Sequence, residues 1–172
     1  YDGTSNPIIK NKYQQIFSPQ TAYQITSMLK GVIERGTGKG LKELKLELAG
    51  KTGTTNKNTD TWFIGFTSNL VVGVYIGYDN PRSLGKFETG SKTAMPVFKD
   101  FIKKTANTFN ARPFKVADNI NMMVIDAKTG KKANPKTKLA IIESFKNNDN
   151  KQDNISNNFD SRLNTTNILK FY

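Results

Sequence analysis

Residues 61–78 read TWFIGFTSNLVVGVYIGY, and this stretch decides the fold. Two runs within it, Thr61 to Thr67 and Leu70 to Tyr78, are rich in aromatic and β-branched residues, which favour strands. Only Ser68-Asn69 separates the runs, so we expect a tight antiparallel hairpin. Just upstream, Leu46, Leu48 and Gly50 alternate with Glu47 and Ala49, and this period of two predicts a third strand that runs into Lys51-Thr52-Gly53.

Helices are predicted on both sides of these strands. The first has Ser18 as its cap, Pro19 at its first position and a stop at Gly36-Thr37-Gly38. The second covers Ala94 to Ala106. Their predicted buried faces carry Ala22, Ile25, Met28, Leu29, Val32 and Ile33 in the first helix and Val97, Phe98, Phe101 and Ile102 in the second. The order helix, three strands, helix predicts an α+β fold, an antiparallel meander packed with helices.

The character of the chain changes after Pro113. Residues 1–112 carry the helices and the meander. Residues 113–145 are expected to form a small β appendage with strands at Asn121 to Asp126 and Leu139 to Ile142. Residues 146–172 are rich in asparagine and poor in apolar side chains, so we expect a disordered tail.

Composition excludes several classes of function. The 172 residues contain no cysteine and no histidine, which excludes disulfides, thiolate or imidazole metal sites and a Ser-His-Asp triad. No metal and no cofactor are expected. The net charge of +12 suggests nucleic acid as a partner. However, arginine is the usual residue for contacts to bases and phosphates, and only four of the 26 basic residues are arginine, so no nucleic acid is expected. The longest apolar stretch, Leu70 to Tyr78, is too short to cross a bilayer as a helix.

The segment AGKTGTT, residues 49–55, carries the candidate chemistry. An ammonium at Lys51 beside hydroxyls at Thr52 and Thr54 suits a carboxylate, which would accept charge-assisted hydrogen bonds. Gly53 leaves room for an extended peptide beside the strand, and a free backbone N–H there could face an oxyanion. The triplet alone is weak, because it recurs at Lys128-Thr129-Gly130, where we expect a turn.

Several short segments, taken together and in order, give a far more specific signal than the Lys-Thr-Gly triplet. From Phe17 to about Asp126 the chain resembles the C-terminal half of the transpeptidase domain of class A, bifunctional penicillin-binding proteins. The pieces are Ser18 to Tyr23, Met28-Leu29, Arg35 to Gly38, Ala49 to Thr55, Asp60 with Trp62-Phe63, Gly77 to Asp79, the helix start at Ala94-Met95-Pro96, and Ile125-Asp126 with Thr129-Gly130. The tail after about Ile142 is not covered.

This resemblance implies a serine D,D-transpeptidase that cross-links peptidoglycan stem peptides ending in D-Ala-D-Ala and binds β-lactams. It implies that Lys51 is catalytic, polarising the site and assisting proton transfer. Thr52, Gly53 and Thr54 would bind substrate: the threonines hold its carboxylate, Gly53 admits the peptide, and the backbone of Thr54 helps to bind the acyl carbonyl. It also implies a location at the periplasmic face of the inner membrane, with an anchor that is absent from this chain.

The resemblance implies an attacking serine in a Ser-x-x-Lys motif and a second motif, Ser-x-Asn, and both are expected upstream of residue 1. Ser-x-x-Lys occurs at Ser27 to Lys30, where the family has a core helix, and at Ser83 to Lys86, which follows Lys51 in the wrong order. The string at Ser156 to Asn158 matches Ser-x-Asn only in the tail. We therefore expect a fragment, or the product of a truncated or split gene, that needs the upstream half of the domain as its partner and is inactive alone. Two alternatives stay open: a non-catalytic basic module for nucleic acid or anionic glycan, and a non-functional truncated product.

Overall fold

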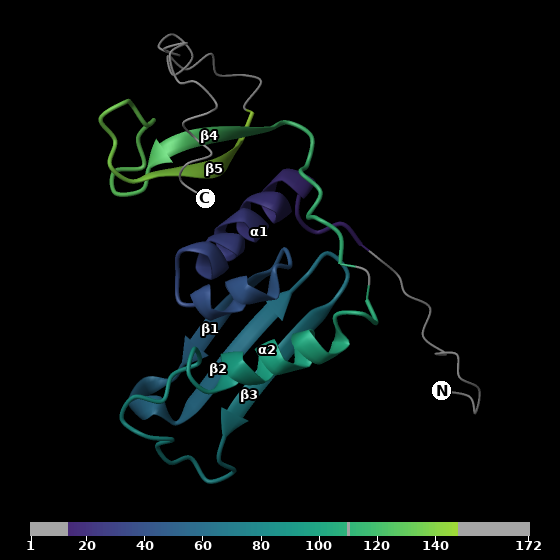
Figure 1. The fold of residues 1–172 in the computed structure, drawn as a ribbon, viewed down its shortest axis with the longest axis vertical. Coiled ribbons are helices and arrows are strands. Elements are labelled where there is room, and N and C mark those ends of the chain that lie inside the picture. Colours follow the sequence, from purple (N-terminus) through teal and green to yellow (C-terminus); the bar gives the residue numbers. More distant parts are fainter. Residues whose placement is uncertain (1–13, 110, 148–172) are drawn as a thin grey trace, which may run out of the picture.

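The computed structural model describes residues 14–109 and 111–147 and has a mixed helix and antiparallel-sheet architecture (Figure 1). The fold-class prediction is confirmed. In chain order the elements are α1 (Pro19–Glu34), the 3-10 helix η1 (Lys39–Leu44), β1 (Ala49–Thr54), the 3-10 helix η2 (Asn56–Asn58), β2 (Asp60–Phe66), β3 (Val71–Gly77), α2 (Ala94–Thr105), β4 (Ile120–Asp126) and β5 (Ala140–Lys146). β1, β2 and β3 form an antiparallel meander in that order, and β4 pairs with β5 separately.

The predicted hairpin is present. β2 pairs with β3 from Asp60↔Gly77 to Phe66↔Val71, and the Thr67 N–H donates to the Leu70 carbonyl at 2.9 Å to close the turn. The preceding strand is shorter than predicted, because it begins only at Ala49. Lys45 adopts a left-handed φ of 53°, which interrupts the extended backbone, and Leu46 and Leu48 instead reach the core from an irregular segment.

The core lies between α2 and one face of the meander, as Figure 1 shows by the position of α2 across β2 and β3. Phe63 and Phe98 are fully buried there with ring centroids 4.8 Å apart. Gly65 makes this contact possible, because a Cβ at that position would stand 2.6 Å from the Phe98 ring. The buried cluster also contains Ile33, Leu41, Leu48, Ala94, Met95 and Ile102.

The opposite face of the meander is apolar and open among the described residues. Period-two alternation places Trp62 and Ile64 of β2 with their partners on this face, where both are exposed. Val71 and Tyr75 of β3 stand across from β2 on the same face and are also exposed. Lys51 and Gly53 of β1 belong to this face, opposite Ile64 and Trp62 respectively.

The predicted helix faces are partly wrong. In α1 the cap is as expected, with the Thr21 N–H donating to Ser18 Oγ at 3.2 Å, but Ala22 is exposed, as are Ile25 (51%) and Met28 (57%). Tyr23, Gly31 and Ile33 are the buried residues. The helix contacts β1 and β5. Tyr23 lies beside the segment 114–118 that precedes β4, and Gly31 lies against the Arg35 guanidinium, and a count of apolar residues detects neither.

The face of α2 also differs from the prediction. Phe98 and Ile102 are buried as expected, whereas Val97 and Phe101 are exposed by 51% and 44%. Ala94, Phe98 and Ile102 recur every four residues and follow one line along the helix. The described sheet is only three strands wide, so the strip that carries Val97 and Phe101 has no strand to cover it.

The β appendage lies against α1 on the side away from the meander (Figure 1). β4 matches its predicted strand closely, while β5 starts at Ala140 and runs on to Lys146, beyond the predicted end at Ile142. The second Lys-Thr-Gly copy forms a turn, as predicted: Gly130 has a left-handed φ of 68°, and its N–H donates to the Asp126 carbonyl at 2.8 Å. The predicted tail from residue 148 onward lies outside the described residues.

Candidate active site

β1 is an edge strand, and its outer edge presents the candidate residues. The Thr55 N–H bonds the Asp60 carbonyl at 3.0 Å, so alternate residues Gly53 and Lys51 also direct their backbone groups toward β2. The N–H and C=O of Thr52 and Thr54 therefore point outward. In the part of the chain that the structure describes, β1 has no strand on this side, so these groups are open to an extended peptide.

Lys51 places its ammonium at this edge. Its side chain starts on the open face of the sheet, but Nζ donates to the outward carbonyl of Thr52 at 2.8 Å. The residue is exposed, so the positive charge is accessible to a ligand. An anion lying along the edge would therefore meet a cation beside the backbone groups of Thr52 and Thr54.

The two threonine hydroxyls lie on the other face of β1, and each already has one partner. Thr54 Oγ1 accepts a hydrogen bond from the Gly90 N–H at 3.1 Å. Thr52 Oγ1 lies 3.0 Å from Thr37 Oγ1, with one hydroxyl donating to the other. Because a hydroxyl carries one proton and two acceptor positions, the proton of Thr54 and one proton of the Thr37–Thr52 pair remain available to a carboxylate.

Gly53 and Gly90 bring backbone segments close together here. A Cβ on Gly53 would stand 3.1 Å from the Trp62 Cβ. Close packing against Trp62 is therefore a second reason for glycine at this position, beside the predicted access for a peptide. A Cβ on Gly90 would stand 2.4 Å from the Trp62 carbonyl oxygen and 2.5 Å from that of Gly53. Only glycine therefore lets the turn before α2 lie close enough to reach Thr54.

The loop after Thr54 is held by Asp60. Its carboxylate accepts hydrogen bonds from the hydroxyls of Tyr75 at 2.9 Å, Thr59 at 3.0 Å and Thr55 at 3.2 Å. These bonds favour the ionised form and lower the pKa of Asp60 below its ordinary value of 3.8, with the Tyr75 bond as the largest cause. The same bond raises the pKa of the Tyr75 phenol above 10.0.

Neither described Ser-x-x-Lys string is arranged as a nucleophile with its base. Lys30 pairs with the carboxylate of Glu47, whose other oxygen accepts from the Phe114 N–H at 2.8 Å, so its ammonium serves a structural contact. Ser83 Oγ accepts from the Gly85 N–H at 3.2 Å in an exposed loop. The Ser156 to Asn158 string lies outside the described residues.

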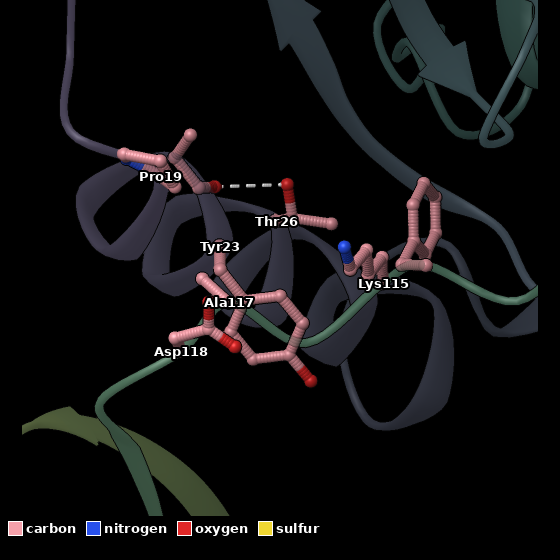
Figure 2. A pocket seen from close by; sticks show the side chains of 8 residues that line it. Pro19, Tyr23, Thr26, Lys115, Ala117 and Asp118 are labelled. Atoms are coloured by element: carbon pink, nitrogen blue, oxygen red, sulfur yellow. Dashed lines mark hydrogen bonds between the residues drawn. The ribbon is translucent and has the colours of Figure 1, made fainter.

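Neither a metal-ion cluster nor a membrane-spanning helix is found among the described residues. Residues 14–109 and 111–147 contain no group of three acidic, cysteine or histidine side chains placed to hold a metal ion. No helix in the same ranges is long and apolar enough to span a bilayer. A pocket of about 390 Å³ lies between α1 and the segment before β4, and none of Lys51 to Thr54 lines it. Tyr23, Lys115 and Asp118, labelled in Figure 2, are among its lining residues.

The sequence reasoning missed Thr37 and Gly90 as parts of this site. From local pattern Gly36-Thr37-Gly38 predicts a helix stop, and Gly90 ends the turn-rich loop that begins at Asp79. They meet β1 across separations of 15 and 36 residues, which local patterns do not report. The sequence signal that could have pointed to Thr37 is the Arg35 to Gly38 piece of the family resemblance, but that piece does not say that Thr37 contacts Thr52.

Comparisons with known proteins agree on one family. A family model described as the penicillin binding protein transpeptidase domain matches residues 8–103. Penicillin-binding protein 1A of Rickettsia conorii (strain ATCC VR-613 / Malish 7) is 45% identical over 139 residues, and that of Pseudomonas aeruginosa PAO1 is 40% identical over 137 residues. These matches cover 81% and 79% of this chain and 17% of each relative. The chain therefore spans about a sixth of their length.

A solved structure gives the same result. The 2.6 Å crystal structure of penicillin-binding protein 1A from Haemophilus influenzae matches with a TM-score of 0.66 and 31% sequence identity. The match covers 76% of this chain and 20% of that chain. Sequence and fold therefore point to the same family.

Proposed function

The chain belongs to the penicillin-binding protein transpeptidase family, and on that premise we propose that it forms one wall of the acyl-transfer site of a peptidoglycan D,D-transpeptidase. The observation that carries this proposal is the Lys51 ammonium at the open edge of β1, beside the outward backbone groups of Thr52 and Thr54. This arrangement supports recognition of a peptide that ends in a carboxylate.

In the proposed reaction, a serine oxygen bonds to the carbonyl carbon of the penultimate D-Ala. The bond to the terminal D-Ala breaks, and that residue leaves with a proton on its new amine. An amine from a neighbouring strand then attacks the acyl-serine, forms the cross-link and returns a proton to the serine. β-Lactams carry a carboxylate beside a reactive carbonyl, so the same contacts would place them for acylation.

Each candidate residue has a role in this proposal. Lys51 attracts the carboxylate and lowers the energy of negative charge during proton transfer. The free protons of Thr54 and of the Thr37–Thr52 pair donate to the carboxylate. Gly53 keeps the edge unobstructed, and the outward N–H of Thr54 stabilises the oxyanion. Loss of such an oxyanion donor typically costs about 3–4 kcal/mol of the barrier.

We propose that the serine and its lysine are supplied by the upstream half of the transpeptidase domain. The described Ser-x-x-Lys strings engage in other contacts, which supports a nucleophile elsewhere. The open apolar face around Trp62, Ile64 and Tyr75 is continuous with Lys51 and suits packing against that half. The isolated chain is then inactive, and the complete protein would act at the periplasmic face of the inner membrane.

A chimera tests this function. In it the chain replaces the matching segment of the Rickettsia conorii relative, and covalent labelling by a fluorescent penicillin is measured. We expect the chimera to label, Lys51→Ala to lose about 100-fold or more in acylation rate, and Lys103→Ala, which removes an exposed lysine of α2, to label normally.

The isolated chain gives the complementary test, since we expect it to form no adduct. Equal labelling of Lys51→Ala and Lys103→Ala would contradict the role of Lys51. A stable adduct on the isolated chain would contradict an external nucleophile.

A further inference from the structure

The C-terminal end of α1 lies between the β appendage and the candidate site. Arg35 follows the helix, and its backbone N–H donates to the Gly31 carbonyl at 2.9 Å. Its guanidinium forms an ion pair with Glu143 of β5. Only two residues later, Thr37 shares a hydrogen bond of 3.0 Å with Thr52. A contact with the appendage is thus two residues away from a contact with β1.

The turn that carries Thr37 is packed tightly onto the helix. A Cβ on Gly36 would stand 2.9 Å from the Val32 Cα and carbonyl oxygen, and a Cβ on Gly38 would stand 2.7 Å from Ile33 Cδ1. The Gly38 N–H also donates to the Val32 carbonyl at 2.9 Å. Thr37 therefore cannot shift without the end of α1 shifting too. Because Thr37 is hydrogen-bonded to Thr52, a shift of this helix end would also move the partner of the Thr52 hydroxyl.

The Arg35 side chain is held in one place by its surroundings. It folds back over Gly31, where an added Cβ would stand 2.7 Å from Nη2 and 2.8 Å from Cζ. Glu143 is only 17% exposed, so this ion pair is partly shielded from water and stronger than a fully exposed one. Glu34 lies 3.3 Å from the other guanidinium nitrogen and adds a second acidic partner.

Other polar contacts attach the appendage along α1. Gln24 Nε2 donates to the Ser144 carbonyl at 3.1 Å, and Lys146 Nζ donates to Thr21 Oγ1 at 2.6 Å. Both reach strand β5 from positions nearer the start of the helix. The Arg35–Glu143 pair adds a third attachment at the end of the helix that leads to Thr37.

We propose that Arg35 and Glu143 are positioning residues for the transpeptidase site. The appendage, through this ion pair, fixes the Thr37 hydroxyl against Thr52 and so sets which proton is presented to the substrate carboxylate. The inference rests on the proposed function, because it concerns the same carboxylate contacts. It gives the β appendage a role in substrate binding.

Gly31→Ala is the sharpest test, because it leaves both charges in place and displaces the guanidinium from its position. Alanine favours a helix over glycine, so this substitution does not lower helix stability by itself. In the chimera we expect the apparent Kd for the penicillin to rise about 3- to 10-fold, with a smaller change in the acylation constant. If the melting temperature of the Gly31→Ala chimera is unchanged or higher, the rise in apparent Kd is not caused by general destabilisation.

Two further variants complete the test. Glu143→Gln is expected to raise the apparent Kd by a similar factor, and the exchanged pair Arg35→Glu with Glu143→Arg to restore it in part. Glu43→Gln, which removes a different ion pair with Lys99 at 2.9 Å, is the matched control and should have no effect. An unchanged Kd in both Gly31→Ala and Glu143→Gln would overturn the inference.

The unmutated chimera and Lys51→Ala together separate failure of the positioning role from failure of the proposed function. If Lys51→Ala loses labelling while Gly31→Ala and Glu143→Gln behave as the unmutated chimera, only the positioning role is wrong. If Lys51→Ala labels normally, the proposed role of Lys51 is wrong, and if the unmutated chimera forms no adduct, the proposed function itself fails. The positioning role is then decided in the 172-residue chain by the Thr52 amide chemical shift: a change in Gly31→Ala supports it, and an unchanged shift overturns it.

Discussion

The substitution Gly90→Ala adds a single methyl group, and we expect it to lower the free energy of unfolding of the chain. The methyl carbon would stand 2.4 Å from the Trp62 carbonyl oxygen, 2.5 Å from that of Gly53 and 3.2 Å from the Gly53 nitrogen. A tolerable carbon–oxygen contact is about 3.3 Å, so the turn must move away by roughly 0.9 Å. The obstructing atoms are backbone atoms of two paired strands and cannot rotate away.

The magnitude follows from two losses. Overpacking of this kind costs about 1–3 kcal/mol. The Gly90 N–H to Thr54 Oγ1 bond, now 3.1 Å, would lengthen past the range of a hydrogen bond, which costs about 0.5–1.5 kcal/mol more. We therefore expect the free energy of unfolding to fall by about 2–4 kcal/mol. Gly90 does not have a left-handed φ, so backbone strain adds nothing.

Urea unfolding measured by the fluorescence of Trp62, the single tryptophan, is the assay. With a slope of about 2 kcal/mol per molar, the midpoint should fall by roughly 1–2 M urea. Gly73→Ala is the matched control, since its added methyl would lie 3.9 Å from Ile64 Cγ1, an ordinary contact, and should change stability by less than about 0.5 kcal/mol. Equal midpoints for the two variants, with unchanged slopes, would refute the reasoning.

Two further predictions concern the core and the loop after β1. Phe98→Ala should cost about 3–5 kcal/mol in calorimetry, whereas Val97→Ala, at an exposed position, should cost less than about 1 kcal/mol; equal losses would contradict the observed helix face. Because the folded pKa of Asp60 is lowered, its contribution to stability is present above pH 3.8 and is lost as the pH falls through the lowered pKa. Tyr75→Phe should raise that pKa toward 3.8 in an NMR titration of the carboxyl carbon, and an unchanged pKa would exclude the hydrogen bond as its cause.

The sequence predicts those features that depend on neighbours in the chain. Alternation and the Ser68-Asn69 turn specify the hairpin, and Ser18 with Pro19 specifies the start of α1, because each signal is confined to a few residues. The Lys51 to Thr54 segment was likewise identified from its own residue types. Its catalytic and substrate-binding roles remain predictions.

The sequence fails where a surface depends on what covers it. Val97 of α2 is exposed where the described sheet is only three strands wide, and Met28 of α1 is exposed although it falls on the predicted apolar face. Helical periodicity does not contain the elements that pack on a helix. The extension of β5 to Lys146 is a related case, since Glu143 to Lys146 lie beyond the predicted strand and pair with β4 back to Ile120, and Lys146 falls within the predicted tail.

The same distinction explains how the candidate site is built. Alternation along β1 sends Lys51 to the open face and Thr52 and Thr54 to the other, so a ligand on either face alone would meet only half of the polar groups. The edge of the strand is the one place where all three are within reach, because the Lys51 ammonium lies at the outward Thr52 carbonyl. An extended peptide that pairs with this edge would therefore bring its carboxylate to the cation and to the hydroxyls together, and the contacts of Thr37 and Gly90 hold those hydroxyls in place for it.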